Sequence, residues 1–128
     1  MNFTTLKDAA QYRILQDEND YWIEDYWKAA IVVSTRDIES AIAFFRTDCS
    51  DEELYWLSEI FEEVVKKTQS RELVETMQER LNKVTSDTYS QQNFKSDYMR
   101  ENVNYTEFVK SIQSEIDYAK GQLAGAEA

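Results

Sequence analysis

Residues 50–67 read SDEELYWLSEIFEEVVKK and carry the strongest helix signal in the chain. Ser50 and Glu53 have the capping-box spacing, in which each side chain accepts a hydrogen bond from the backbone amide of the other residue. At about 100° per residue, one side of the helix collects the apolar side chains. They are Leu54, Leu57, Ile60, Phe61, Val64 and Val65. Lys66 and Lys67 suit the carboxyl end of a helix dipole. We therefore predict an amphipathic helix that begins after Ser50 and ends near Thr68.

Similar apolar spacing and polar caps predict further helices on both sides of this segment. The predicted ranges are 5–17, 21–33, 36–47, 71–84 and 105–120, with caps at Asp20, Thr35, Ser70 and Asn104 and a stop at Gly121. Residues 85–96 are polar and weakly periodic, so we expect a long loop or a frayed helix there. The chain has no proline and only two glycines, which favours short polar turns between helices. We predict an all-α fold, with residues 1–128 forming a single-domain bundle of five to six amphipathic helices.

The composition excludes several classes of function. The 128 residues carry a formal net charge of −11, which repels nucleic acids and anionic membranes. Histidine is absent and Cys49 is the one cysteine, so catalytic triads, His-bearing zinc sites and internal disulfides are excluded. We expect Cys49 to be a packing thiol. No glycine-rich phosphate loop, export signal or long apolar run is present. We therefore expect a cytoplasmic, non-enzymatic protein without a metal or another cofactor.

The negative charge is concentrated in the first half of the chain. Residues 1–64 have a net charge of −10, whereas residues 65–128 have a net charge of −1. Such polarisation affects the choice of partner and the rate of association rather than the fold. The first half is therefore the part in which we look for a binding surface.

Residues 17–27, DENDYWIEDYW, combine acidic and aromatic side chains. The acids are Asp17, Glu18, Asp20, Glu24 and Asp25, and the aromatics are Tyr21, Trp22, Tyr26 and Trp27. One interpretation is a binding surface, because aromatic residues dominate interface energetics and carboxylates complement a basic partner. The other interpretation places Trp22, Tyr26 and Trp27 in the core and leaves the acids as a solvated face.

The outward side of the helix after Ser50 has a similar character. It carries Glu52, Tyr55, Trp56, Glu59, Glu63 and Lys66. Trp56 is either covered by another element or exposed within an acidic stripe. Paired carboxylates such as Glu59 and Glu63 also occur in glycosidases and carboxylate metal sites, but acids four residues apart are common on exposed helix faces. We favour the solvated helix face over a catalytic or metal site.

Two runs, DYWKAAIVVSTRDIESAIAFF (25–45) and SDEELYWLSEIFEEVVKKTQSRELVETMQERL (50–81), carry a resemblance to a known family. The matching residues are Asp37, Ile38, Ala41, Ile42, Phe45, Ser50, Glu52, Glu53, Leu54, Trp56, Leu57, Glu59, Ile60, Phe61, Lys67, Thr68, Gln69, Ser70, Arg71 and Glu72. The chain resembles the helical immunity proteins of bacterial contact-dependent growth inhibition and related polymorphic-toxin systems. The resemblance covers about half of the chain and is most specific between residues 67 and 72.

This resemblance implies a small cytoplasmic helical protein that neutralises one cognate toxin C-terminal domain, usually a nuclease acting on tRNA or DNA. We expect a monomer that forms a 1:1 complex and touches neither nucleic acid nor membrane. The expected partner-binding residues are Asp17, Glu18, Asp20, Glu24, Asp25, Glu52, Trp56, Glu59 and Glu63. The alternatives are a helical adaptor or regulatory subunit with a hydrophobic groove, formed by residues 105–123, and a carboxylate metalloenzyme.

Overall fold

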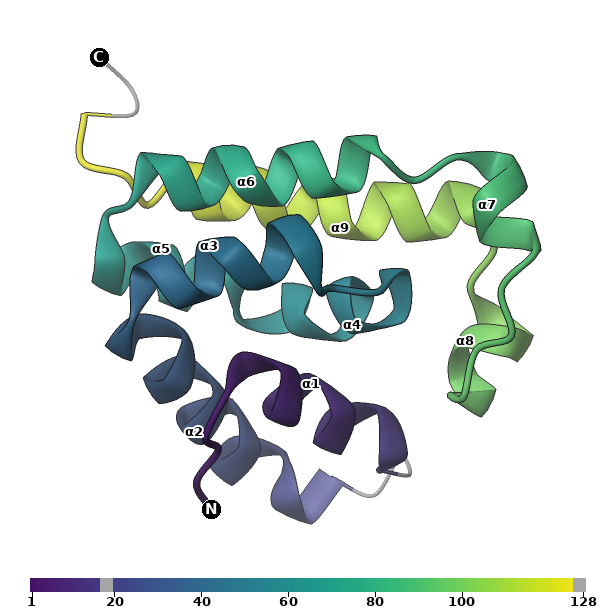
Figure 1. Cartoon of the computed structure of the whole chain (residues 1–128), viewed down its shortest axis with the longest axis horizontal. Coiled ribbons are helices and arrows are strands. Elements are labelled where there is room, and N and C mark those ends of the chain that lie inside the picture. The colour runs from purple at the N-terminus through teal and green to yellow at the C-terminus, as the bar shows by residue number, and fades with distance from the viewer. Residues whose placement is uncertain (17–19, 126–128) are drawn as a thin grey trace.

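The computed structural model describes residues 1–16 and 20–125, and this part of the chain is helical and contains no strand (Figure 1). The elements are α1 (Leu6–Leu15), η1 (Asp20–Trp22), α2 (Ile23–Arg36), α3 (Ile38–Thr47), α4 (Asp51–Leu57), η2 (Ser58–Ile60), α5 (Phe61–Thr68), α6 (Arg71–Asn82), α7 (Ser86–Ser90), α8 (Asp97–Asn102) and α9 (Tyr105–Lys120). The prediction of an all-α fold is confirmed, but there are more helices than the five or six expected. The helices of residues 1–16 and 20–125 lack the length and apolar character that a membrane-spanning helix needs.

The helix predicted after Ser50 is interrupted. Both halves of the capping box form, with Glu53 N donating to the Ser50 hydroxyl at 3.1 Å and Ser50 N donating to the Glu53 carboxylate at 2.8 Å. The Ser58 hydroxyl then donates to the Tyr55 carbonyl, and the backbone tightens into the 3-10 turn η2. Helix α5 resumes and ends at Thr68, as predicted, with Gln69 in the left-handed conformation (φ 53°).

Several other boundaries differ from the prediction. Helix α2 begins at Ile23 with Trp22 at its cap position, so the predicted cap at Asp20 is wrong. The cap between α2 and α3 is Asp37 rather than Thr35, because Asp37 accepts a hydrogen bond from Ser40 N at 3.1 Å. The Thr35 hydroxyl instead donates to the Ile31 carbonyl within α2. Residues 85–96, expected to be a long loop or a frayed helix, contain the short helix α7, which starts at a capping box of Thr85 and Thr88 and is followed by an irregular segment. The side-chain caps at Asp37 and Thr85 each bond to a residue three positions later, and the spacing of apolar residues does not reveal them.

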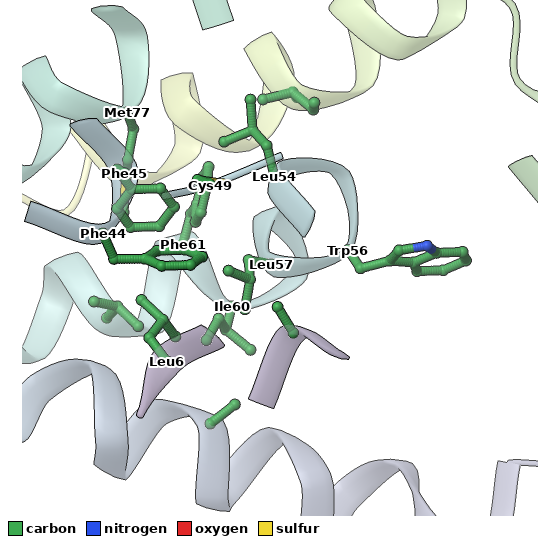
Figure 2. Packing of buried hydrophobic residues seen from close by; sticks show 14 of the residues in the cluster. Leu6, Phe44, Phe45, Cys49, Leu54, Trp56, Leu57, Ile60, Phe61 and Met77 are labelled. Atoms are coloured by element: carbon green, nitrogen blue, oxygen red, sulfur yellow. The ribbon is translucent and has the colours of Figure 1, made fainter. Parts of the chain in front are cut away.

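Helix α9 packs against α5 and α6, and it runs beside α6 along the upper side of the molecule in Figure 1. Its apolar face is buried, with Phe108 and Ile112 both 0% exposed. The core continues through Phe61 on α5 and Met77 on α6 (Figure 2). Burial of such side chains provides the main driving force for this fold. The stop at Gly121 agrees with the prediction, and the residue keeps a right-handed conformation there (φ −64°).

The first turn of α4 carries three consecutive buried acids, Asp51, Glu52 and Glu53. Asp51 accepts hydrogen bonds from Arg80 on α6 and from Gln92 in the segment before α8. The Glu53 carboxylate accepts bonds from Lys7 Nζ at 3.1 Å and from Gln11 Nε2 at 2.7 Å, both on α1. The amino end of a helix favours negative charge, which helps to offset the cost of burying these groups. The first turn of α4 therefore connects three distant parts of the chain.

Candidate functional site

An open groove of about 1060 Å³ lies between the carboxyl end of α1 with η1 and the amino end of α8. Residues of α4, η2 and α9 complete its walls. The lining residues are Arg13, Ile14, Leu15, Gln16, Trp22, Ile23, Tyr55, Trp56, Ser58, Glu59, Lys95, Ser96, Asp97, Tyr98, Ser111 and Glu115. Aromatic and charged side chains thus meet in one concave surface, which is the candidate functional site.

Arg13 on α1 contacts groove residues of η1, α4 and η2. Its guanidinium donates two hydrogen bonds to the Glu59 carboxylate, from Nη2 at 2.9 Å and from Nε at 3.2 Å. The same guanidinium lies 4.1 Å from the ring centroid of Trp56 and 5.1 Å from that of Trp22. Arginine favours such combined two-bond pairing and aromatic stacking. The groove therefore already contains one cation bound by a carboxylate and aromatic rings.

Three buried polar groups around Arg13 and Glu59 have no hydrogen-bond partner among the described residues. They are Trp22 Nε1, Trp56 Nε1 and the Tyr26 hydroxyl. Burial raises the pKa of Tyr26, and the nearby negative charge of Glu59 raises it further. Unpartnered buried donors are rare in folded proteins. The region around Arg13 and Glu59 therefore contains three buried hydrogen-bond donors that lack an acceptor among the described residues.

We expect Tyr55 to make the free energy of unfolding depend on alkaline pH. Burial, followed by the neighbouring Tyr98, raises the pKa of Tyr55 from 10.0 to about 12. The unfolded chain therefore loses the tyrosine proton first, so stability is complete below about pH 10 and declines as the pH rises towards 12. We expect urea unfolding to show this decline, and Tyr55→Phe to reduce its slope. An unchanged slope in the Tyr55→Phe variant would show that Tyr55 does not contribute.

Two of the nine predicted partner-binding residues, Trp56 and Glu59, line the groove. Trp56 is directed away from the labelled core residues Phe45, Phe61 and Met77 (Figure 2). It is nevertheless only 8% exposed, because it packs against Arg13, Tyr55 and Tyr98. The interpretation of Trp56 as an exposed aromatic is therefore wrong. Glu59 remains at the surface, where it also accepts a hydrogen bond from Trp27 Nε1 at 3.3 Å.

Glu52 was expected to bind a partner, and the structure corrects this prediction. The side chain is buried, and its carboxylate accepts backbone N–H bonds from Lys95 at 3.1 Å and Ser96 at 2.8 Å. These bonds hold the amino end of α8 against α4. Glu52 therefore has a structural role, and the residues that it binds are more than forty positions away in the sequence.

The remaining predicted residues lie elsewhere. Glu24 and Asp25 are exposed in the first turn of α2, directly after the groove residues Trp22 and Ile23. Glu63 is exposed on α5 and does not line the groove. Asp20 begins η1, and Asp17 and Glu18 lie outside the described residues. The acidic residues expected to form one surface are thus divided between the groove, the start of α2 and α5.

Sequence reasoning missed several groove residues, notably Arg13, Tyr98 and Glu115. They come from α1, α8 and α9, and no local pattern connects them. In the sequence Arg13 is part of the predicted helix 5–17, and the aromatic rings that it contacts, Trp22 and Trp56, are 9 and 43 residues away. The groove exists because distant helices meet, so a search along the sequence does not reveal it.

Cys49 is buried, as expected for a packing thiol, and burial raises the pKa of its thiol. Within residues 1–16 and 20–125, no group of three or more cysteine, aspartate or glutamate side chains is arranged to hold a metal ion. Comparison of the chain with protein-family models, curated proteins and solved structures identifies no match.

Proposed function

We propose that this protein is an immunity protein that binds a basic toxin domain stoichiometrically and neutralises it without catalysis. One observation carries the proposal, namely the combination of exposed aromatic and acidic side chains at the start of α2. Tyr21 is 85% exposed and Trp27 is 38% exposed, and the acids Glu24 and Asp25 lie between them. Exposed tyrosine and tryptophan are typical of interface hot spots.

The charge of the chain supports a basic partner. A nuclease must hold phosphates and is therefore commonly basic, so its surface complements a protein with a net charge of −11. Opposite fields also accelerate association, which suits an inhibitor that must capture a toxin soon after entry. The proposal includes a cytoplasmic location and a 1:1 complex between two folded domains.

The test is co-expression with the C-terminal part of the adjacent upstream reading frame, about 150–250 residues, which is the span of one or two domains. We expect that fragment to stop growth alone, the present chain to restore growth, and the two to purify together at one to one. The Glu24→Lys/Asp25→Lys double variant should associate about tenfold more slowly at low salt. Glu75→Lys/Glu79→Lys makes the same charge change at exposed positions on α6 and serves as the matched control.

Two results would contradict the proposal. One is a chain that neither rescues growth nor binds the fragment. The other is an interaction whose association rate does not depend on salt, since a charge-steered encounter weakens with ionic strength. The two double variants behaving alike would contradict the position of the interface at the start of α2.

The adaptor alternative is less well supported, because it required a free apolar face on residues 105–123. In α9 that face is buried in the core, including Phe108, Ile112 and Ile116. Deleting the last helix would expose the core residues that pack against it, so the deletion does not test binding alone. The salt dependence of binding instead distinguishes a charge-steered interface from an apolar one.

A further inference from the structure

Glu115 differs from the other acidic residues of the groove in its lack of a bonded partner. Among the described residues, Glu59 is paired with Arg13 and Asp97 with Arg100, whereas Glu115 has no hydrogen bond or ion pair. Glu115 lies in the second half of α9, a helix that packs against both α5 and α6. The groove therefore presents a carboxylate on a rigid element without a partner of its own.

The surroundings of Glu115 are negatively charged and partly shielded from water. Its side chain is partly buried, and burial raises its pKa, with further contributions from the neighbouring carboxylates of Glu62 and Glu59. Arg13 is already bound to Glu59, and Lys95, which also lines the groove, is exposed to solvent. A cation placed at Glu115 would relieve the repulsion among the three carboxylates.

The aromatic lining offers a second contribution to cation binding. Tyr55, Trp56 and Tyr98 form a cluster, with ring centroids 5.1 Å apart for Tyr55 and Trp56 and 5.8 Å apart for Trp56 and Tyr98. Arg13 lies over Trp56 in this groove, so the same chemistry is already present within the chain. Guanidinium and ammonium groups both bind aromatic faces favourably.

We propose that the groove docks a basic polypeptide segment of the toxin and that Glu115 pairs with an arginine or lysine side chain of that segment. The inference rests on the proposed function and specifies where the partner binds. A basic polypeptide suits the groove because the groove is open and combines carboxylate and aromatic side chains from η1, α4, η2, α8 and α9. The indole N–H groups of Trp22 and Trp56 have no acceptor among the described residues, and both side chains are more than nine-tenths buried. The backbone carbonyls of a polypeptide are acceptors of the kind that these N–H groups lack.

The first experiment uses a defined probe instead of the toxin. Acetyl-Arg-Arg-Arg-amide is titrated into the full chain, and the indole N–H signals of Trp22 and Trp56 are followed by NMR. The matching citrulline tripeptide has nearly the same shape without the charge. We expect a saturable shift of the Trp56 signal with the arginine peptide and none with the citrulline peptide. Equal shifts with both peptides, or a shift confined to the indole N–H of Trp27, which does not line the groove, would overturn the inference.

The matched variants are Glu115→Gln and Glu75→Gln. Glu75 is an exposed acid on α6 outside the groove, so both variants remove one negative charge from a helix. Glu115→Gln should weaken arginine-peptide binding and toxin binding at least about tenfold, the size expected for a charge-assisted hydrogen bond. Glu75→Gln should change both by less than twofold. Urea unfolding of each variant verifies that the fold is retained.

The outcomes separate this inference from the proposed function. If the chain neutralises the toxin but Glu115→Gln binds it as tightly as Glu75→Gln does, the groove assignment is wrong and the proposed function stands. If the arginine peptide binds at the groove but the toxin fragment is not neutralised, the proposed function is wrong and the toxin is not the partner, although the groove still binds basic peptides.

Discussion

Replacing Glu53 by alanine is expected to lower the free energy of unfolding by about 3 kcal/mol, or Tm by roughly 10 °C. Glu53 is 0% exposed and has three roles at once. It closes the capping box with Ser50, pairs with Lys7 and accepts a bond from Gln11. Alanine removes all of these bonds, loosens α1 from α4 and leaves a cavity. Urea unfolding monitored by circular dichroism measures the loss.

Two further variants separate the roles of Glu53. Glu53→Gln retains a capping-box acceptor and the side-chain volume but removes the charge opposite Lys7, so its effect should be about half as large. Glu63→Ala removes an exposed acid from α5 and should change stability by no more than about 0.5 kcal/mol. A Glu53→Ala protein as stable as the Glu63→Ala protein would contradict the role assigned to the first turn of α4.

Replacing Phe108 by alanine is expected to cost about 3–5 kcal/mol, a large part of the stability of a domain this size. Phe108 is 0% exposed on α9, with its ring centroid 6.0 Å from that of Tyr55 and 4.8 Å from that of Tyr89. It therefore joins α9 to α4 and α7, and a cavity there is bounded by large rings that cannot easily fill it.

The matched control for Phe108→Ala is Tyr118→Ala, which removes an aromatic ring from the same helix. Tyr118 is 60% exposed, so its loss should change the free energy of unfolding by less than about 0.5 kcal/mol. The comparison cancels the small effect of alanine on helix propensity. Equal losses in the two variants would show that α9 contributes through its helical backbone rather than through its buried face.

The helix starts illustrate what a sequence of this kind reveals. Ser50, Ser70 and Asn104 each accept a hydrogen bond from an amide three residues later, as their patterns predict. The apolar spacing after Ser50 also survives the 3-10 turn at Ser58, so the predicted core residues Leu54 and Phe61 are both buried. The resemblance to immunity proteins and the binding function inferred from it stay predictions, since the structure does not test them.

The acidic residues illustrate where the sequence is ambiguous. Glu52, Glu59 and Glu63 lie on one predicted helix and look alike in the sequence, yet their positions differ. Glu52 is buried and accepts hydrogen bonds from the backbone amides of residues 95 and 96. Glu59 is paired with Arg13, and Glu63 is exposed. Whether an acid binds a partner or supports the fold depends on groups 43–46 residues away.

Caps and apolar periodicity act within a few neighbouring residues, so the helical class, the helix starts after Ser50, Ser70 and Asn104 and many core residues are predictable from the sequence. The burial of Glu52 and Trp56 and the groove that contains Arg13 and Glu115 depend on how the helices pack. These features arise where helices distant in sequence meet, and the free energy of burying a charge or a ring depends on partners that only the assembled fold supplies.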